Sequence, residues 1–356
     1  MFFRFLFTIG VAASGLAMTT PAQPSRPEAE ISEFVFSDAP FESCHASTIL
    51  ELPNGDLLCA WFGGKDEGDA SVEIWLSKKT SGGADAWSAP QAMTDFPHEP
   101  CWNPVLFFDE QSRVWLFFKV GPSPQTWVGA YRLSTDLGKS WGDINYLPAG
   151  LLGPVRSKPI TLSSGEILAG TSVEAGRGPN TPREAPYVSW ACWVERSSDN
   201  GQSWTTHGPI MVPGENFGVI QPTLWEFEPG KVKMLMRSTQ RIGAICESIS
   251  EDGGITWSPA KPTLLPNPNS GIDAVKMQDG RIALVYNHTP QGRSPLNLAF
   301  SEDNGSTWSQ PYILEDEPGE YSYPAIIQSA SGNLHITYTW RRQRIKHVVI
   351  EPEKLP

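Results

Sequence analysis

Short runs in which apolar and polar residues alternate recur along the whole chain, separated by turn residues. Leu296–Phe300 (LNLAF) is one such run. In four further segments a Gly turn separates two apolar stretches: Leu52–Leu58 (LPNGDLL), Leu162–Leu168 (LSSGEIL), Met277–Tyr286 (MQDGRIALVY) and Ser329–Tyr338 (SASGNLHITY). Alternation with a period of two indicates β-strands, and Gly between such runs indicates a hairpin. The pattern therefore predicts a succession of β-hairpins.

A second pattern, Ser-x-Asp-x-Gly-x-x-Trp (the Asp box), occurs at Ser134–Trp141, Ser197–Trp204, Ser250–Trp257 and Ser301–Trp308. A degenerate copy without the Asp occupies Ser77–Trp87. Each copy follows an alternating run, so it predicts a strand, a turn and a strand. Asp accepts hydrogen bonds from backbone N–H groups, Gly adopts a positive φ, and Trp packs the turn onto the sheet. We expect these repeat residues to be structural.

The five copies start 51 to 63 residues apart, which is enough for about four short strands each. The residues after about 315 and the segment Ile31–Ser37 supply a sixth unit. The sequence thus predicts an all-β fold, a closed six-bladed β-propeller with Asp-box hairpins, in which the two termini share a blade. Residues 23–356 are expected to form this single domain.

Composition and charge limit the classes of protein and partner. Gly and Pro, the costliest residues in a helix interior, number 32 each, which argues against a helical protein. The 27 Lys and Arg residues are outnumbered by 39 Asp and Glu residues, giving a net charge of −12. This charge argues against a nucleic acid or an anionic membrane as partner. An anionic ligand would need a local cluster of basic residues.

Residues 1–22 contain a single Arg, an apolar run and a stretch of small residues that ends at Ala22. This arrangement predicts a signal peptide cleaved after Ala22 and an exported, periplasmic or secreted product. No other apolar stretch approaches the length of a membrane-spanning helix. We further expect a monomer.

The sequence offers no cofactor or zinc motif. The five cysteines, an odd number, include no CxxC pair and no Cys beside a His at ligand spacing, so we expect buried free thiols with at most one disulfide. Phosphate-binding Gly loops, the Gly-x-Ser-x-Gly elbow and EF-hand spacing are also absent. We therefore expect no cofactor and no metal, although calcium bound by loop carboxylates stays open.

In a propeller the ligand binds on the axis, where the inner strands and loops of all blades converge. Polar residues in otherwise apolar segments are therefore the candidates for substrate contact or catalysis. They are His45, Asp66, Asp69, Lys119, Lys158, Gln221, Arg237, Asn287, His288, Arg293, Glu320, Tyr321, Tyr323 and Arg341. The same segments also contain, without an assigned role, Glu67, Asn103, Arg156, Asn269 and Arg342, and Trp102 and Trp127 are candidates for stacking on a sugar.

The repeats and their spacing resemble the sialidase superfamily, most closely the bacterial predicted neuraminidases with Asp boxes, over about residues 35–350. Sialidases share three arginines that hold the substrate carboxylate, an Asp acid/base, and a Tyr nucleophile activated by a Glu. The resemblance implies an exo-acting glycoside hydrolase that removes a terminal acidic sugar, sialic acid or a related carboxylated sugar, from a glycan.

The resemblance also implies individual roles. Arg237 and Arg293 match two of the three arginines, and the loop WFGGKDEGD offers Asp66 or Asp69 as the acid. Tyr321 matches the nucleophile, with Tyr323 expected on the same strand face.

Two departures from the sialidase pattern concern the reacting groups. His45 stands where the first arginine is expected, and Thr339 stands in place of the acidic residue that supports it. Gln221 stands where the activating Glu is expected, and an amide can orient a phenol but cannot take its proton. Glu320 or His45 would then have to act as the base.

Other assignments of the same residues remain open. Lys119 and Lys158 are expected to add positive charge to the site, and Asn287, His288 and Arg341 to contact the substrate. A structural role, in which they bond carbonyl groups between blades, is the alternative for Arg237 and Arg293. Two other functions fit as well: a polysaccharide lyase that uses a His or Tyr base for β-elimination on a uronate, and a glycan-binding propeller without activity.

Overall fold

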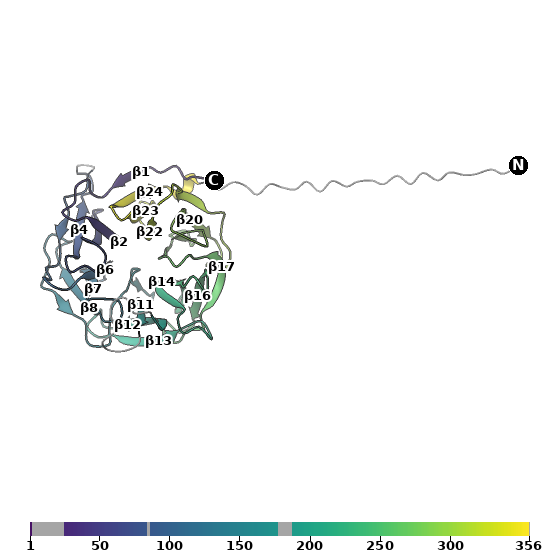
Figure 1. Ribbon diagram of the computed structural model, residues 1–356, viewed down its shortest axis with the longest axis horizontal. Coiled ribbons are helices and arrows are strands. Elements are labelled where there is room, and N and C mark those ends of the chain that lie inside the picture. Colours follow the sequence, from purple (N-terminus) through teal and green to yellow (C-terminus); the bar gives the residue numbers. More distant parts are fainter. Residues whose placement is uncertain (2–24, 84–85, 177–186, 356) are drawn as a thin grey trace.

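The computed structural model describes Met1 and residues 25–83, 86–176 and 187–355. Within these residues, six antiparallel sheets of four strands each form a ring around a central axis (Figure 1). The fold is a six-bladed β-propeller, as the repeats predicted. The predicted signal peptide lies outside the described residues apart from Met1.

Each blade is a four-stranded meander, and its strands run from the axis outward. The first three blades are β2 (Ser43–Glu51), β3 (Leu57–Gly64), β4 (Glu73–Lys79) and β5 (Gln91–Ala92); β6 (Cys101–Phe108), β7 (Val114–Val120), β8 (Val128–Ser134) and β9 (Asn145–Tyr146); and β10 (Ile160–Thr161), β11 (Ile167–Ala175), β12 (Ser189–Ser197) and β13 (Thr205–Ile210). The next two are β14 (Val219–Glu228), β15 (Lys231–Ser238), β16 (Ala244–Ser250) and β17 (Lys261–Pro266); and β18 (Asp273–Lys276), β19 (Ile282–Tyr286), β20 (Leu296–Ser301) and β21 (Tyr312–Glu315).

The sixth blade closes the ring with strands from both ends of the described chain. It consists of β22 (Tyr321–Gln328), β23 (Leu334–Trp340), β24 (Arg344–Ile350) and, as its outer strand, β1 (Ile31–Phe34). β1 pairs with β24 over four residues, from Ile31 with Val349 to Phe34 with Lys346. This pairing confirms that the two termini share a blade.

The Asp boxes form the predicted hairpin turns. In the copy that starts at Ser301, the Ser301 hydroxyl donates to Asp303 over 2.8 Å, while the backbone N–H and the hydroxyl of Thr307 each donate to Asp303 over 2.7 Å. Trp308 packs against the hydrophobic core between blades four and five. The four full copies repeat the Ser-to-Asp bond at 2.8 Å, so these residues shape the turns at a distance from the axis.

Four inner strands carry a bulge, each with one residue in the left-handed region. These residues are Ala46 (φ 58°), Asn103 (φ 41°), Gln221 (φ 55°) and Tyr323 (φ 51°). A left-handed conformation costs a residue with a Cβ about 1–2 kcal/mol, and a bulge redirects a side chain relative to the regular pleat. Such strain concentrates at functional sites, so the space that these four residues surround is a candidate site.

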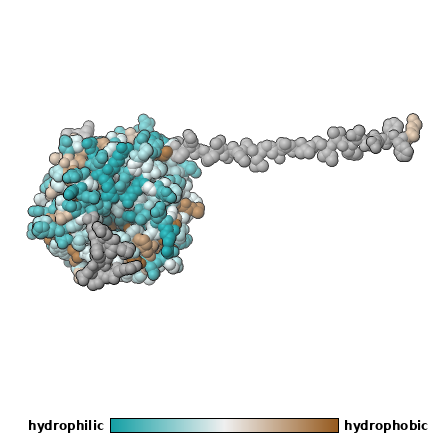
Figure 2. Space-filling view, in the orientation of Figure 1, coloured by the Kyte–Doolittle hydropathy of each residue, from teal (hydrophilic) through white to brown (hydrophobic). Residues whose placement is uncertain are grey.

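All five cysteines are buried free thiols. No helix among the described residues is long and apolar enough to cross a membrane. On the face shown in Figure 2, hydrophilic residues cover most of the described surface.

Candidate functional site

A cavity of about 320 Å³ lies on the propeller axis and is called the axial cavity below. Every blade except the third lines it with an inner strand or an adjoining loop, and the third contributes Glu174 on its second strand and Trp190 on its third. The polar and charged lining residues are His45, Glu67, Asn103, Glu174, Tyr187, Gln221, Arg237, Asn269, Arg293, Tyr323 and Arg342. An adjoining pocket of about 460 Å³ shares Glu67, Tyr187 and Arg342 with it and adds Asp66.

Tyr323 is at the centre of the polar contacts in the axial cavity. Its phenol oxygen accepts hydrogen bonds from Arg237 Nη1 (2.8 Å) and from Gln221 Nε2 (3.1 Å). The His45 ring packs against the Tyr323 ring with 4.1 Å between centroids. On the Tyr323 ring also lies the guanidinium of the buried Arg156, 5.1 Å from the centroid, and Arg156 donates to the carbonyl of Pro324. These contacts fix the phenol in the cavity.

Tyr321 lies outside the axial cavity, in the hydrophobic core between blades five and six. Its phenol oxygen accepts hydrogen bonds from Arg341 Nε (3.3 Å) and Nη2 (3.1 Å). The expectation that Tyr321 and Tyr323 share a strand face was wrong, because the register shifts between Ser322 and Ala325 and Tyr323 has a positive φ. The bulge gives the two side chains different surroundings, and it directs Tyr323, not Tyr321, to the site.

Three arginines line the axial cavity: Arg237 on β15, Arg293 in the loop before β20, and Arg342 in the turn between β23 and β24. The Arg342 carbonyl accepts a hydrogen bond from the N–H of Cys44, the residue next to His45. The last blade therefore brings the backbone of Arg342 next to the strand where the first arginine was expected, and the charge of Arg342 acts on His45. The neighbouring Arg341 is directed elsewhere, since its guanidinium lies 4.7 Å from the Trp340 ring.

Glu320 connects two of these arginines. Its carboxylate pairs with Arg293 Nη1 (2.7 Å) and Arg342 Nε (3.1 Å), and Arg342 Nη1 also pairs with Glu67 (2.6 Å). Burial acts to raise the pKa of Glu320, but Arg293, Arg342 and the Ser322 hydroxyl together hold it below its ordinary value. Glu320 is therefore an ionised group that orients arginines. Among the described residues, no hydrogen bond joins it to the phenol of Tyr321, for which it was expected as a base, or to that of Tyr323.

His45 is completely buried at the cavity wall, and neither ring nitrogen has a hydrogen-bond partner among the described residues. Burial, followed by the charges of four arginines, holds the pKa of His45 well below its usual value. The ring is consequently neutral at neutral pH, with two nitrogens available to a bound molecule.

The acidic residues occupy three different environments. Asp66 lines the adjoining pocket and accepts the Glu67 N–H over 2.8 Å. Asp69 lines neither cavity, because it accepts the N–H (2.9 Å) and hydroxyl (2.7 Å) of Ser71 and so shapes its own loop. Glu174, near the end of β11, lines the axial cavity with 6% of its surface exposed. Burial raises the pKa of Glu174 to about 7, although Arg237 opposes this shift.

Five other candidates from the sequence lie outside the axial cavity, each bound to its own surroundings. The buried Lys119 donates to the Pro154 carbonyl, and burial lowers its pKa to about 7. Lys158 pairs with Asp273 over 2.9 Å. Asn287 donates to the carbonyls of Pro295 (2.9 Å) and Tyr321 (3.0 Å), His288 bonds the Tyr286 hydroxyl (2.5 Å), and Arg341 bonds Tyr321. The two lysines therefore add no charge to the site, since both ammonium groups bind other parts of the chain.

Sequence reasoning assigned no role to Asn103, Glu174 or Arg342. One signal was present for the first, because Asn103, Gln221 and Tyr323 each precede a proline in an inner strand (CWNPV, VIQPT, YSYPA). Proline in a central strand marks a bulge, so the three dipeptides indicate redirected side chains. Among the described residues, no group of three or more His, Cys, Asp and Glu side chains is arranged to hold a metal ion.

Comparison with known proteins extends these observations. A model of the BNR repeat-like domain matches residues 55–336. A protein named "Sialidase" from Bacteroides fragilis (strain YCH46) is 26% identical over 242 residues, which are 62% of this chain and 40% of that protein. The chain thus corresponds to about two fifths of this relative's length.

Two solved structures share the fold. The NanB sialidase from Streptococcus pneumoniae superposes with a TM-score of 0.74 at 14% identity, covering 91% of this chain and 71% of that one. A protein of unknown function from Dyadobacter fermentans DSM 18053 gives a TM-score of 0.73 at 17% identity, covering 93% and 100%.

Proposed function

The chain belongs to the BNR repeat-like domain family, and from this premise we propose that it is a sialidase-like glycoside hydrolase. Its proposed substrate is a glycan with a terminal carboxylated sugar, sialic acid or a related one. The single observation that carries this proposal is that three arginines and the Tyr323 hydroxyl share the axial cavity. The resemblance of the Asp-box repeats to the sialidase superfamily agrees with the family match.

The three arginines supply the basic cluster that an acidic chain needs to bind an anion. Arg237, Arg293 and Arg342 present planar guanidinium groups, which bind a carboxylate through paired hydrogen bonds. Glu320 fixes the orientation of two of them, so little side-chain entropy is lost when the ligand binds. Trp102 and Trp127 offer aromatic surface for the sugar ring in the same cavity.

Tyr323 takes the role of nucleophile, which the sequence resemblance gave to Tyr321. Its phenol oxygen, positioned by Arg237 and Gln221, attacks the anomeric carbon while the glycosidic bond breaks and a carboxylic acid protonates the leaving oxygen. A neutral phenol approaches an anionic sugar without the repulsion that a carboxylate would meet. Water then releases the sugar from the tyrosine.

His45 is the proposed acceptor of the phenol proton, because its ring contacts Tyr323 and both of its nitrogens lack partners among the described residues. Part of the depression of the His45 pKa comes from arginines. A substrate carboxylate bound to those arginines offsets their charge, which makes His45 a stronger base in the complex than in the free protein.

The test is to incubate the purified protein with glycosides of sialic acid, of other 3-deoxy carboxylated sugars and of uronates, and to assay free sugar. We expect release from a carboxylated glycoside, loss of at least about 100-fold in kcat for Tyr323→Phe, and little change for Tyr321→Phe. Full turnover by Tyr323→Phe, or no hydrolysis of any carboxylated glycoside by the wild type, would refute the proposal.

The contact between His45 and Tyr323 favours a second candidate, β-elimination on a uronate by a His/Tyr pair with arginines that neutralise the carboxylate. The same incubation separates the alternatives. Elimination creates an unsaturated sugar that absorbs in the ultraviolet, hydrolysis does not, and a non-catalytic glycan-binding propeller yields saturable binding without product.

Export through cleavage after Ala22 is a further proposal, tested by the mass of the mature protein.

A further inference from the structure

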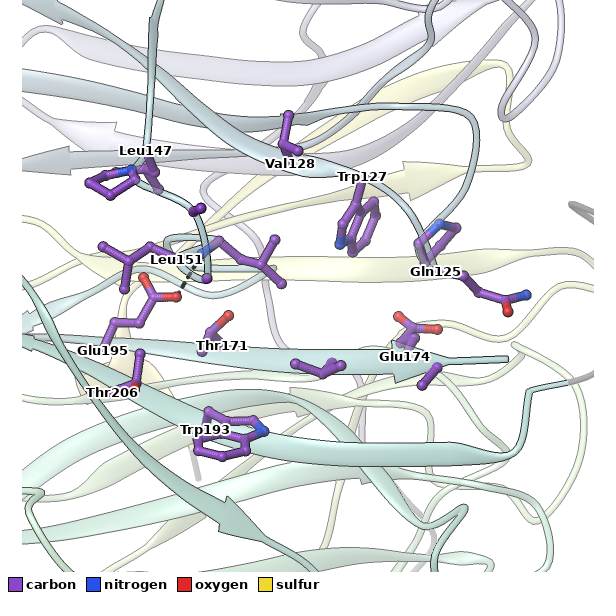
Figure 3. A pocket seen from close by; sticks show the side chains of 17 residues that line it. Gln125, Trp127, Val128, Leu147, Leu151, Thr171, Glu174, Trp193, Glu195 and Thr206 are labelled. Carbon is purple, nitrogen blue, oxygen red and sulfur yellow. Dashed lines mark hydrogen bonds between the residues drawn. The ribbon is translucent and has the colours of Figure 1, made fainter. Parts of the chain in front are cut away.

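A further cavity, of about 440 Å³, opens between the second and third blades and is called the lateral pocket. Its wall is mainly apolar and comes from Val128, Leu147, Leu151, Val173 and Trp193, with several Pro and Ala residues (Figure 3). Val128 and Val173 are exposed to 48% and 44%. Exposed apolar side chains gathered around a concave surface are typical of a binding site for an apolar group.

The lateral pocket and the axial cavity share three lining residues, Pro124, Trp127 and Glu174. These residues therefore mark the place where the two cavities meet. A glycoside whose sugar occupies the axial cavity and whose leaving group occupies the lateral pocket has its scissile oxygen at this junction. Of the three shared residues, Glu174 is the one that can exchange a proton.

The two buried carboxyl groups of the lateral pocket differ in their partners. Glu195 accepts the backbone N–H groups of Leu152 (2.7 Å) and Gly153 (2.8 Å), so it has a structural role. Glu174 has no hydrogen bond to any described residue, and in Figure 3 its carboxyl group points toward Trp127 on the opposite wall. A carboxyl group that is only 6% exposed and has no hydrogen bond to the described residues is costly unless a ligand or a function accounts for it.

From this geometry we infer that the lateral pocket binds the leaving group of the substrate, an aglycone with apolar surface, and that Glu174 protonates the glycosidic oxygen. The inference rests on the proposed hydrolase function and adds to it the acid and the class of leaving group. It gives Glu174 the role that the sequence resemblance assigned to Asp66 or Asp69.

The proposed step is balanced in protons and electrons. The bond between the anomeric carbon and the glycosidic oxygen breaks, its electron pair stays on that oxygen, and the Glu174 carboxyl proton moves to it. Tyr323 forms the new bond to the anomeric carbon, and its phenol proton passes to His45. Water then attacks the same carbon and gives a proton to Glu174, while the departing phenolate recovers its proton from His45.

The protonation state of Glu174 suits this step. With a pKa of about 7, the carboxyl group is substantially protonated at neutral pH, and this value is close to the optimum for a general acid working there. Arg237 is the group that opposes the upward shift. A substrate carboxylate paired with Arg237 weakens this opposition, so binding favours the acid form.

The deciding experiment compares two glycosides of the same carboxylated sugar, one with an alkyl alcohol and one with nitrophenol as leaving group. Nitrophenol departs as a stable anion and needs no acid. For Glu174→Gln we expect kcat/KM to fall at least about 100-fold with the alkyl glycoside and less than about tenfold with the nitrophenyl glycoside. In Glu174→Gln, the decrease of kcat/KM on the alkaline side of the pH profile should also disappear.

Asp66→Asn is the matched variant for the competing acid, and it should reduce kcat/KM for both glycosides by a similar factor. Equal losses on both glycosides for Glu174→Gln, or the leaving-group difference appearing in Asp66→Asn instead, would overturn the inference. A wild-type protein that cleaves neither glycoside refutes the proposed function itself, so the two failures are distinguishable. Circular dichroism of each variant checks that the fold is intact.

The lateral pocket has its own test. Val173→Asp introduces a charge into the apolar wall, and it should raise KM several-fold more for an octyl glycoside than for the methyl glycoside. Leu264→Asp changes an equally apolar side chain that is fully exposed outside the pocket, and it should alter neither value. Equal KM changes with both glycosides in Val173→Asp would refute the assignment of the pocket.

Discussion

Gln221 and Tyr323 are hydrogen-bonded across the axial cavity, from Nε2 to the phenol oxygen over 3.1 Å, and each occupies the left-handed position of a bulge in its own blade. The other amide atom of Gln221 accepts a bond from Arg237 Nη1 over 3.0 Å. One amide thus holds both the proposed nucleophile and one of the three arginines.

Replacing this amide by a carboxylate provides the first prediction. Gln221→Glu should raise kcat at neutral pH, because the carboxylate can take the phenol proton directly, and should raise KM, because it offsets the charge of Arg237. The pH dependence of kcat should gain a limb on the acidic side, where the new group is protonated. Gln221→Leu, which keeps neither bond, serves as the comparison and should lower kcat. Equal losses in both variants would contradict this view of Gln221.

Arg342 and Arg341 are adjacent in sequence but differ in surroundings, which allows a matched comparison. Arg342→Ala removes one charged hydrogen-bond donor from the axial cavity and should raise KM for a carboxylated sugar about 10- to 100-fold, since such bonds contribute about 1.5–3 kcal/mol. Arg341→Ala removes the contacts with Trp340 and Tyr321, so it should lower the melting temperature while KM stays unchanged. Steady-state kinetics and thermal unfolding of both variants measure these effects, and a larger KM change in Arg341→Ala would be incompatible with the proposed clamp.

The junction where the ring closes should make stability depend on pH. Glu33 on β1 pairs with Lys79 of β4 (2.7 Å) and with His347 of β24 (3.0 Å), accepts the Trp87 N–H (3.0 Å), and His347 contacts His335 of β23 (3.1 Å). Burial lowers the pKa of His335 to about 4 and also lowers that of His347, although Glu33 opposes the latter shift. Burial acts to raise the pKa of Glu33, but His347 and Lys79 lower it to about 2.

All three shifts have the same sign for stability. A histidine whose pKa is depressed in the folded state takes up protons more readily when unfolded, so its contribution is complete above about pH 6.5 and is lost as the pH falls toward 4. The contribution of Glu33 is complete above its unfolded value and is lost as the pH falls toward 2. The free energy of unfolding should therefore decrease steadily below pH 6.5.

Urea denaturation between pH 3 and pH 8 measures this dependence. His335→Gln should flatten the part of the curve between pH 6.5 and 4, and Glu33→Gln the part below pH 4.5. Unchanged slopes in both variants would locate the acid sensitivity elsewhere in the molecule.

The Asp boxes should matter for stability and not for chemistry. Asp303→Ala removes the acceptor of four hydrogen bonds at a turn, so it should lower the melting temperature without changing kcat/KM. The adjacent exposed Glu302→Ala is the control and should change neither quantity. A loss of activity in folded Asp303→Ala would contradict a purely structural role.

Much of the fold could be predicted because each blade repeats the same local chemistry. Asp303, Gly305 and Trp308 specify a turn through contacts within a few residues, and the spacing of five such turns, together with the segments at the two ends of the chain, gives the number of blades. Arg237 and Arg293, which line the axial cavity, could also be named in advance, because a family resemblance anchors their positions next to Asp boxes.

The sequence by itself therefore determined the strands, the blades, the shared terminal blade and two of the three arginines. Only the tertiary structure decided that Tyr323 and a third arginine, Arg342, line the axial cavity. It also brought Glu174 to the junction of the axial cavity and the lateral pocket. The choice of Tyr323 over Tyr321 depends on a bulge, and a shift of one residue reverses the direction of every side chain in a strand. Arg342 reaches the first blade only because the ring closes, which brings residues about 300 positions apart in sequence into contact.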